Sequence, residues 1–373
     1  LAIPLFIFSA DIIARGQIGN RLLKLVESLI GHITGGLAIT TAIACALFGA
    51  ISGVGAAAVI SIGPIVFPAL LRQGYSRGFA VGLILTASTL AMLIPPGVAM
   101  ILYSLQTMSS VSSVFLAGLS AGIIFTTLLA IYSYVYARVL NIGRQEKASW
   151  NERLTSLREA CWALGLPAII FGGIYSGVFT PTEAGAAAAC YALGYGVLFK
   201  GKPFLKDLMG VTRRTMNLTA LVFFLLGCVG IFQFYLANMG WPQEIAAWAG
   251  TLGLSKYAFL FALIGTLLAL SMWLTGVAIL VLTVPIYFPI ALSLGIDPVH
   301  LGILTALCIE IGSVIPPVGL NLFAVSGVTG LPVTQVIKGS FPFCLSDTVV
   351  LIIVLLFPML ALWLPGKLIT SYF

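Results

Sequence analysis

The sequence predicts an all-α polytopic membrane protein, and two features of its composition carry that prediction. Of the 373 residues, 60% are hydrophobic and only 8% are charged, whereas a soluble domain carries about 25% charged residues. Asp, Glu, Lys and Arg are absent from three long stretches, 28–71, 78–137 and 257–296. A helix needs about 20 apolar residues to cross a bilayer, so these stretches hold several spans. The short alternating segments of a membrane β-barrel do not occur.

The net charge of +7 indicates membrane topology. Basic residues gather in a few short segments, and short loops rich in Lys and Arg stay in the cytoplasm. We therefore expect segments 72–77, 138–158 and 200–214 to be cytoplasmic. This placement disfavours nucleic-acid binding, the other interpretation of a basic chain. Between these cytoplasmic segments the chain crosses the membrane outward and back. The expected spans are 78–104, 115–137, 162–176, 184–199 and 217–237.

An internal repeat is the strongest feature of the sequence. At an offset of 221 residues, 11 positions in a 42-residue window are identical without a gap. Many of them are prolines and glycines, which chance similarity between apolar helices would not align, so duplication explains the pattern. The first copy contributes Gly55, Ala57, Pro64, Ile65, Phe67, Pro68, Leu71, Gly74, Ile94, Pro95 and Pro96, and the second begins at Gly276 and ends at Pro317.

The two copies are expected to have opposite orientations. Arg72 and Arg77 flank the loop at Gly74, whereas the matching loop at Gly295 has only an acid and a histidine nearby. Lys and Arg mark the cytoplasmic side, so the first loop is predicted inside and the second outside. Inverted repeats with broken helices are typical of secondary transporters, whose sites lie between the repeats near the bilayer midplane.

Each copy contains a hairpin and a broken helix. A small-residue tip at 50–55 or 271–276 is followed by a limb of about a dozen residues before a proline bend, which predicts re-entrant hairpins. A helix interrupted by Pro-Pro follows in each copy. The expected organisation is a scaffold or arm segment (1–34), a first repeat (35–137), a cytoplasmic loop with central scaffold helices and a second arm (138–256), a second repeat (257–340) and a C-terminal helix (341–373).

The broken helices and tips predict cation sites. A double proline frees carbonyl oxygens of the preceding turn, and in hydrocarbon these need a partner. A bound cation is one such partner, and a neighbouring helix or water is the alternative. Small residues at the tips could equally serve close helix packing. The candidate Na⁺ ligands are Ser52, Gly53, Gly55, Thr86, Ser88 and Thr89 at the first tip, and Thr275, Gly276 and Gly312, with Asn321, at the second.

Few acids fall in the apolar segments. Glu310 lies in an otherwise uncharged stretch, and an intramembrane carboxylate is a functional residue by default. A hydrogen-bonded tether near the site is favoured over cation binding or proton transfer. Asp11 and Asp347 are single acids near expected helix ends, to which the pattern assigns no chemistry. Glu183 is expected to cap a helix after Thr180. No catalytic motif or Walker A sequence occurs, which argues against a membrane enzyme and against ATP as the direct energy source.

The chain resembles the large membrane subunit of tripartite ATP-independent periplasmic (TRAP) transporters over essentially its whole length. FTPTEA at 179–184 and PPVGLN at 316–321 are the most specific motifs. The others are LAIPLFIF (1–8), GH (31–32), GGL (35–37), ISG (51–53), GY (74–75), IPP (94–96), GGIY (172–175), GIDP (295–298) and Gly312.

The resemblance implies a Na⁺-driven, elevator-type importer of organic anions in the bacterial inner membrane, with two or more Na⁺ ions. It implies three kinds of contact besides lipid: a soluble periplasmic binding protein, a small membrane (Q) subunit that is separate or fused, and the anion. It also implies further helices before Leu1.

Several residues depart from the family pattern at the expected site. Val54 and Gly97 replace a common Ser, Thr275 replaces a common Asp, and Cys308 replaces a common Asn. Dicarboxylates, keto acids, sugar acids and sulfonates therefore all stay open. A free-standing Na⁺/anion symporter of similar fold is the alternative. The residues expected beside the substrate are Val54, Pro96, Gly97, Glu310, Pro317 and Asn321.

Overall fold

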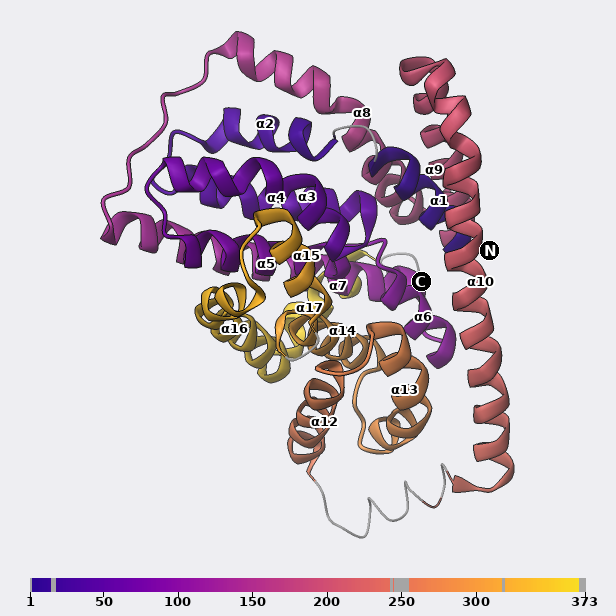
Figure 1. Cartoon of the computed structure of the whole chain (residues 1–373). Coiled ribbons are helices and arrows are strands. Elements are labelled where there is room, and N and C mark those ends of the chain that lie inside the picture. Colours follow the sequence, from indigo (N-terminus) through magenta and orange to yellow (C-terminus); the bar gives the residue numbers. More distant parts are fainter. Residues whose placement is uncertain (1, 15–17, 242–243, 245–254, 317–318, 369–373) are drawn as a thin grey trace.

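The computed structural model describes residues 2–14, 18–241, 244, 255–316 and 319–368. Within these ranges every regular element is a helix, and seven helices are long and apolar enough to cross a membrane. The prediction of an all-α polytopic membrane protein is confirmed. The helices lie in one bundle, with the long α10 (Lys202–Asn238) along one edge (Figure 1).

The helices outside the repeats pack on one another and on the hairpins of both repeats. Helix α1 (Ala2–Ala14) contacts α9 (Pro181–Tyr195) and α10, and α2 (Ile18–Ile30) contacts α8 (Trp150–Tyr175). A short π-helix, η1 (Gly196–Lys200), joins α9 to the segment before α10.

Two of these helices begin with a capping box. Ser149 and Glu152 cap α8, and Thr180 and Glu183 cap α9, as the sequence predicts for Glu183. The backbone N–H and then the hydroxyl of Thr180 donate to the Glu183 carboxylate, and these bonds hold its pKa below the ordinary 4.5.

The first repeat folds as a helical hairpin followed by a broken helix. Its elements are α3 (Gly36–Ser52), α4 (Gly55–Arg72), α5 (Arg77–Leu93), α6 (Val98–Thr107) and α7 (Val111–Val139). The hairpin turns at Gly53, whose φ of 62° is left-handed and therefore suits glycine. Helix α5 ends at Leu93, and a non-helical segment with a cis Pro95–Pro96 bond separates it from α6.

The second repeat has the same order of elements. It comprises α12 (Lys256–Ser271), α13 (Gly276–Ser293), α14 (Pro298–Val314), α15 (Leu320–Thr329) and α16 (Val333–Leu356), and a last helix, α17 (Pro358–Leu368), follows it. Helix α15 packs against α4, and α14 packs against α5. The two repeats therefore interlock, and each broken helix lies against an element of the other copy.

The limbs that follow the tips are longer than the sequence predicts. Helices α4 and α13 each run for 18 residues and continue through two internal prolines, so the expectation of a dozen residues before a proline bend is wrong. Helices in membranes tolerate proline because neighbouring groups satisfy the freed carbonyls. Each limb is long enough to cross a bilayer, and the re-entrant geometry of the hairpins stays a prediction.

Candidate functional site

The first tip lies directly against the break between α5 and α6. A Cβ atom added to Gly53 would lie 2.6 Å from the carbonyl oxygen of Pro96. Only a glycine lets the tip come this close. The neighbouring Ser52 side chain is buried, and its hydroxyl accepts a long hydrogen bond from the Val54 amide at 3.5 Å. The tip thus carries a hydroxyl and lies beside the backbone carbonyl of Pro96.

Gly55, the first residue of α4, forms the second contact of this tip. A Cβ atom there would lie 3.1 Å from the Ser88 carbonyl oxygen and 2.9 Å from Asn321 Nδ2. The Asn321 amide also donates to Ser313 Oγ at 3.2 Å. The sequence grouped Asn321 with the second tip. Because α15 packs on α4, Asn321 lies beside Gly55 of the first hairpin, while its bond to Ser313 also joins it to α14 of the second repeat.

The three predicted hydroxyls of α5 face other partners. Ser88 Oγ donates to the Leu85 carbonyl at 2.5 Å, and Thr89 Oγ1 donates to the Thr86 carbonyl at 2.8 Å. Thr86 Oγ1 donates to Asp347 Oδ2 on α16 at 3.5 Å. What α5 offers to the tip is therefore the backbone carbonyl of Ser88.

Two close glycine contacts hold the second tip, 271–276. A Cβ atom at Gly312 of α14 would overlap the Ser271 hydroxyl, and one at Gly276 would overlap the Ile309 side chain. Thr275 is exposed and precedes α13 without a side-chain capping bond. Its hydroxyl therefore keeps its hydrogen-bonding capacity for a ligand.

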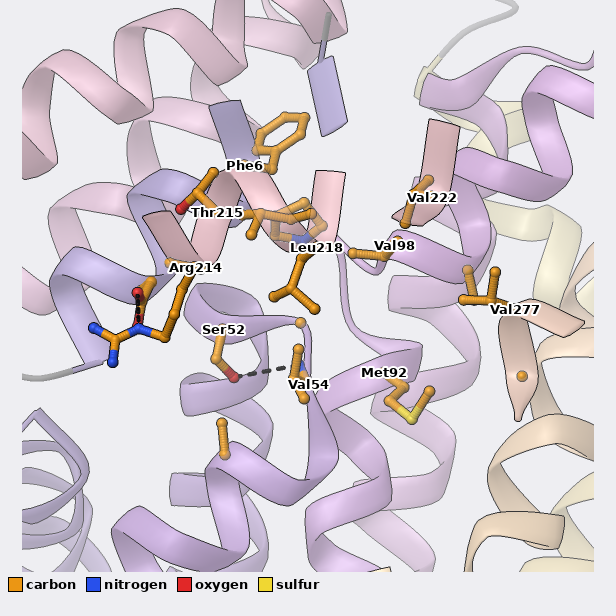
Figure 2. Close-up of a pocket in the computed structure, with 18 of the residues that line it drawn as sticks. Phe6, Ser52, Val54, Met92, Val98, Arg214, Thr215, Leu218, Val222 and Val277 are labelled. Carbon is orange, nitrogen blue, oxygen red and sulfur yellow. Dashed lines mark hydrogen bonds and ion pairs between the residues drawn. The ribbon is translucent and has the colours of Figure 1, made fainter. Parts of the chain in front are cut away.

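Both tips line one cavity of about 430 Å³. Figure 2 shows Ser52 and Val54 across the cavity from side chains of α10, with Val277 further along the wall. Six predicted residues line it: Ser52, Gly53, Val54, Pro96, Thr275 and Gly276. Eight do not: Gly55, Thr86, Ser88, Thr89, Gly97, Glu310, Gly312 and Asn321. Pro317 lies outside the described residues.

The far wall of the cavity comes from α1 and α10, which sequence reasoning missed. Arg214 Nε donates to Asp11 Oδ2 at 3.3 Å, and both residues line the cavity. Thr215, which follows Arg214, lines it too. The one sequence signal is that Arg214 is the last charged residue before the uncharged stretch 215–243.

Glu310 is 1% exposed, and neither of its carboxylate oxygens has a hydrogen-bond partner among the described residues. The expected hydrogen-bonded tether is therefore wrong. Glu310 also stays off the cavity wall, because it lies inside the packing of α14. Asp347 is buried within α16 instead of lying near a helix end.

Comparisons with known proteins agree with this architecture. The family model described as "Tripartite ATP-independent periplasmic transporter, DctM component" matches residues 1–360. The chain is 40% identical to the C4-dicarboxylate TRAP transporter large permease protein DctM of Pseudomonas aeruginosa, over 98% of this chain and 86% of that protein. It is 38% identical to the ectoine/5-hydroxyectoine large permease protein UehC of Ruegeria pomeroyi, over 98% of this chain and 85% of that protein.

A likeness to a solved structure extends over 96% of the chain. The crystal structure of the Alcanivorax borkumensis YdaH transporter matches with a TM-score of 0.65 at 17% identity, over 85% of that chain, and this likeness concerns the fold alone. The relatives that show the family are transport permeases and not enzymes. With its repeated hairpins and broken helices, this chain belongs to the DctM family, the large permease subunits of TRAP transporters.

Proposed function

We propose that this permease imports a small organic anion across the bacterial inner membrane, driven by Na⁺, with one part of the chain moving as an elevator. The observation that carries the proposal is the convergence of both hairpin tips on one cavity. Each tip belongs to one copy of a duplicated unit, and duplicated units with broken helices around a shared site are typical of secondary transporters.

The helix ends around the cavity favour separate places for cation and anion. Helices α3 and α5 end at the first tip, and the C-terminal end of a helix carries partial negative charge. The Ser52 hydroxyl and the carbonyls of Ser88 and Pro96 add oxygen atoms there, which are the ligands that hard cations prefer. Helices α4 and α13 begin at the tips, and their positive ends favour an anion.

The second tip supplies a different set of oxygen ligands for a cation. Thr275 offers an exposed hydroxyl, and the tight packing of Gly276 and Gly312 fixes the backbone around it. We assign one Na⁺ to each tip.

Two Na⁺ ions are energetically sufficient for this task. Moving one negative charge into a cell at about −100 mV costs about 2.3 kcal/mol. Two co-transported Na⁺ ions reverse the net charge that crosses and add their own concentration gradient. The Na⁺ gradient then drives accumulation of a monoanion without direct hydrolysis of ATP.

The names of relatives support an anion as substrate and two protein partners. Relatives are named as permeases for C4-dicarboxylate, sialic acid and isethionate, which are anions, and others for ectoine, a zwitterion that carries a carboxylate. The isethionate permease is named DctMQ, and this chain matches 58% of its length, which supports a small Q subunit as partner, fused or separate. A periplasmic binding protein delivers the anion.

Uptake into proteoliposomes tests the proposal. The chain is reconstituted with its small subunit, its binding protein and the anion which that protein carries. We expect uptake only with external Na⁺, with a Hill coefficient for Na⁺ above one. Equal uptake driven by a proton gradient without Na⁺ would contradict the proposal. Omitting the binding protein tests the alternative of a free-standing symporter, which would transport without it.

A further inference from the structure

We propose that Glu310 and Asp347 form a proton-binding site inside the helix packing, in which Glu310 holds a proton and is neutral while the helices are packed. Neither acid lines the cavity between the tips. The inference goes beyond the proposed function, which concerns Na⁺ and the anion. The ligand of the new site is H⁺, bound to a carboxylate oxygen of Glu310.

Both acids lie deep in the packing of three helices. Glu310 on α14 and Asp347 on α16 are each 1% exposed. Helix α14 packs against α16, and both pack against α5 of the first repeat. The two carboxyl groups interact electrostatically with each other. Two negative charges at this place would repel each other with little screening by water, so both acids cannot be ionised together without compensation.

The surroundings of Glu310 supply no compensation for a negative charge. Neither of its carboxylate oxygens has a hydrogen-bond partner among the described residues. Within the same part of the chain, no Lys, Arg or His is among the groups that act on either acid. A carboxylate without donors or a counter-charge is so unfavourable in an apolar interior that the group takes up a proton instead. The compensation for Glu310 is therefore a proton.

Asp347 has polar neighbours that Glu310 lacks. Thr86 Oγ1 of α5 donates to Asp347 Oδ2 at 3.5 Å, and Ser346 Oγ lies 3.3 Å from Asp347 Oδ1. Both contacts are longer than the usual distance of about 2.7–2.8 Å between two oxygens. They still make Asp347 the better placed of the two acids to carry a charge, and Glu310 the better placed to hold the proton.

Asp347 is the titratable group that acts on Glu310 from the surrounding helices. His300 on α14, Tyr287 on α13 and Tyr103 on α6 each form a hydrogen bond with another group. The remaining titratable residues on α14 and the helices packed against it are Cys308 on α14, Lys338 and Cys344 on α16, Arg77 on α5, Tyr132, Tyr134, Tyr136 and Arg138 on α7, Lys256 and Tyr257 on α12 and Lys367 on α17.

The helices that enclose the proton also carry contacts of both tips. Gly312, two residues after Glu310, packs against the second tip. Ser88, two residues after Thr86, presents its carbonyl oxygen to Gly55 of the first tip. A charge on Glu310 would favour separation of α14 from α16 and α5, because only water could then stabilise it. The bound proton therefore keeps the helices behind both tips packed together.

Infrared difference spectroscopy on the full chain in lipid nanodiscs tests the inference. The spectrum of Glu310→Gln is subtracted from that of the wild type at neutral pH. A protonated carboxyl group absorbs through its C=O stretch, well apart from the two stretches of a carboxylate. We expect the difference to contain the band of a protonated carboxyl group and no carboxylate bands. Glu183→Gln is the control, because Glu183 is exposed at a helix cap and its difference should contain carboxylate bands.

The pH dependence of stability gives a second readout. In the unfolded chain Glu310 is ionised at neutral pH, so the folded state binds one more proton and stability falls as pH rises. Each such proton changes the folding equilibrium by about tenfold per pH unit. The melting temperature of the wild type should therefore fall with rising pH relative to that of Glu310→Met, whose side chain has a similar length and cannot ionise.

Two results would overturn the inference. The first is a carboxylate signal in the wild type minus Glu310→Gln spectrum, and a dependence of that signal on Na⁺ would identify a cation site in place of the proton. The second is an equal pH dependence of the melting temperature in the wild type and Glu310→Met. If neither variant of Glu310 folds, Asp347→Asn decides: a protonated carboxyl band at neutral pH supports the inference, and its absence overturns it.

Discussion

Replacing Gly53 by alanine tests whether the close approach of the first tip to the helix break matters for ion coupling. The new Cβ atom would lie 2.6 Å from the Pro96 carbonyl oxygen, whereas an ordinary contact between carbon and oxygen is about 3.3 Å or longer. The tip or the break must therefore move by about 0.7 Å. Overpacking of this kind costs about 1–3 kcal/mol, and every 1.4 kcal/mol is about tenfold in affinity.

Gly74→Ala is the matched control for this change. Gly74 also has a positive φ, 92°, so both variants carry a left-handed strain of about 1–2 kcal/mol. A Cβ atom at Gly74, however, meets nothing within 4 Å. In Na⁺-dependent uptake, Gly53→Ala should raise the half-saturating Na⁺ concentration by about fivefold or more, and Gly74→Ala should leave it unchanged. Equal values for the two variants would refute the role given to this contact.

Three further predictions concern the tips, the orientation of the repeats and a helix cap. Ser52→Ala and Thr275→Ala should each raise the half-saturating Na⁺ concentration. If neither variant changes that concentration, hydroxyl coordination at the tips is excluded. In a background without native cysteines, a cysteine replacing Gly74 should be labelled only from the cytoplasm and one replacing Gly295 only from the periplasm, and labelling of both from one side would mean parallel repeats. Glu183→Gln should lower the melting temperature at neutral pH. The lowered pKa of Glu183 means that this difference shrinks as pH falls below 4.5 and vanishes below the folded pKa, and a pH-independent difference would contradict the cap.

The hairpins and breaks could be predicted because their signals are local. Glycine and proline act on the backbone within a few residues, so the tip at Gly53 and the break at Pro95 are readable from the chain itself. The same holds for the capping box of Thr180 and Glu183, whose residues are three apart.

The remaining parts of the site depend on packing between distant segments. Asp11 and Arg214 are 203 residues apart, and no local pattern indicates that α1 and α10 meet. Asn321 lies beside Gly55 only because α15 packs on α4 of the other repeat. The limb length was mispredicted because Pro64 and Pro68 would end a soluble helix, whereas a membrane helix continues through them.

The number of Na⁺ ions moved per anion tests most directly the claim that two tips act as two cation sites. In proteoliposomes at zero membrane potential, the anion gradient that just stops net flux is measured at several Na⁺ gradients. With two ions per anion, a tenfold larger Na⁺ gradient should be balanced by an anion gradient about a hundredfold larger, since each tenfold step is worth about 1.4 kcal/mol per ion. A shift of only about tenfold would leave one tip without a transported ion, and no shift at all would contradict Na⁺ coupling.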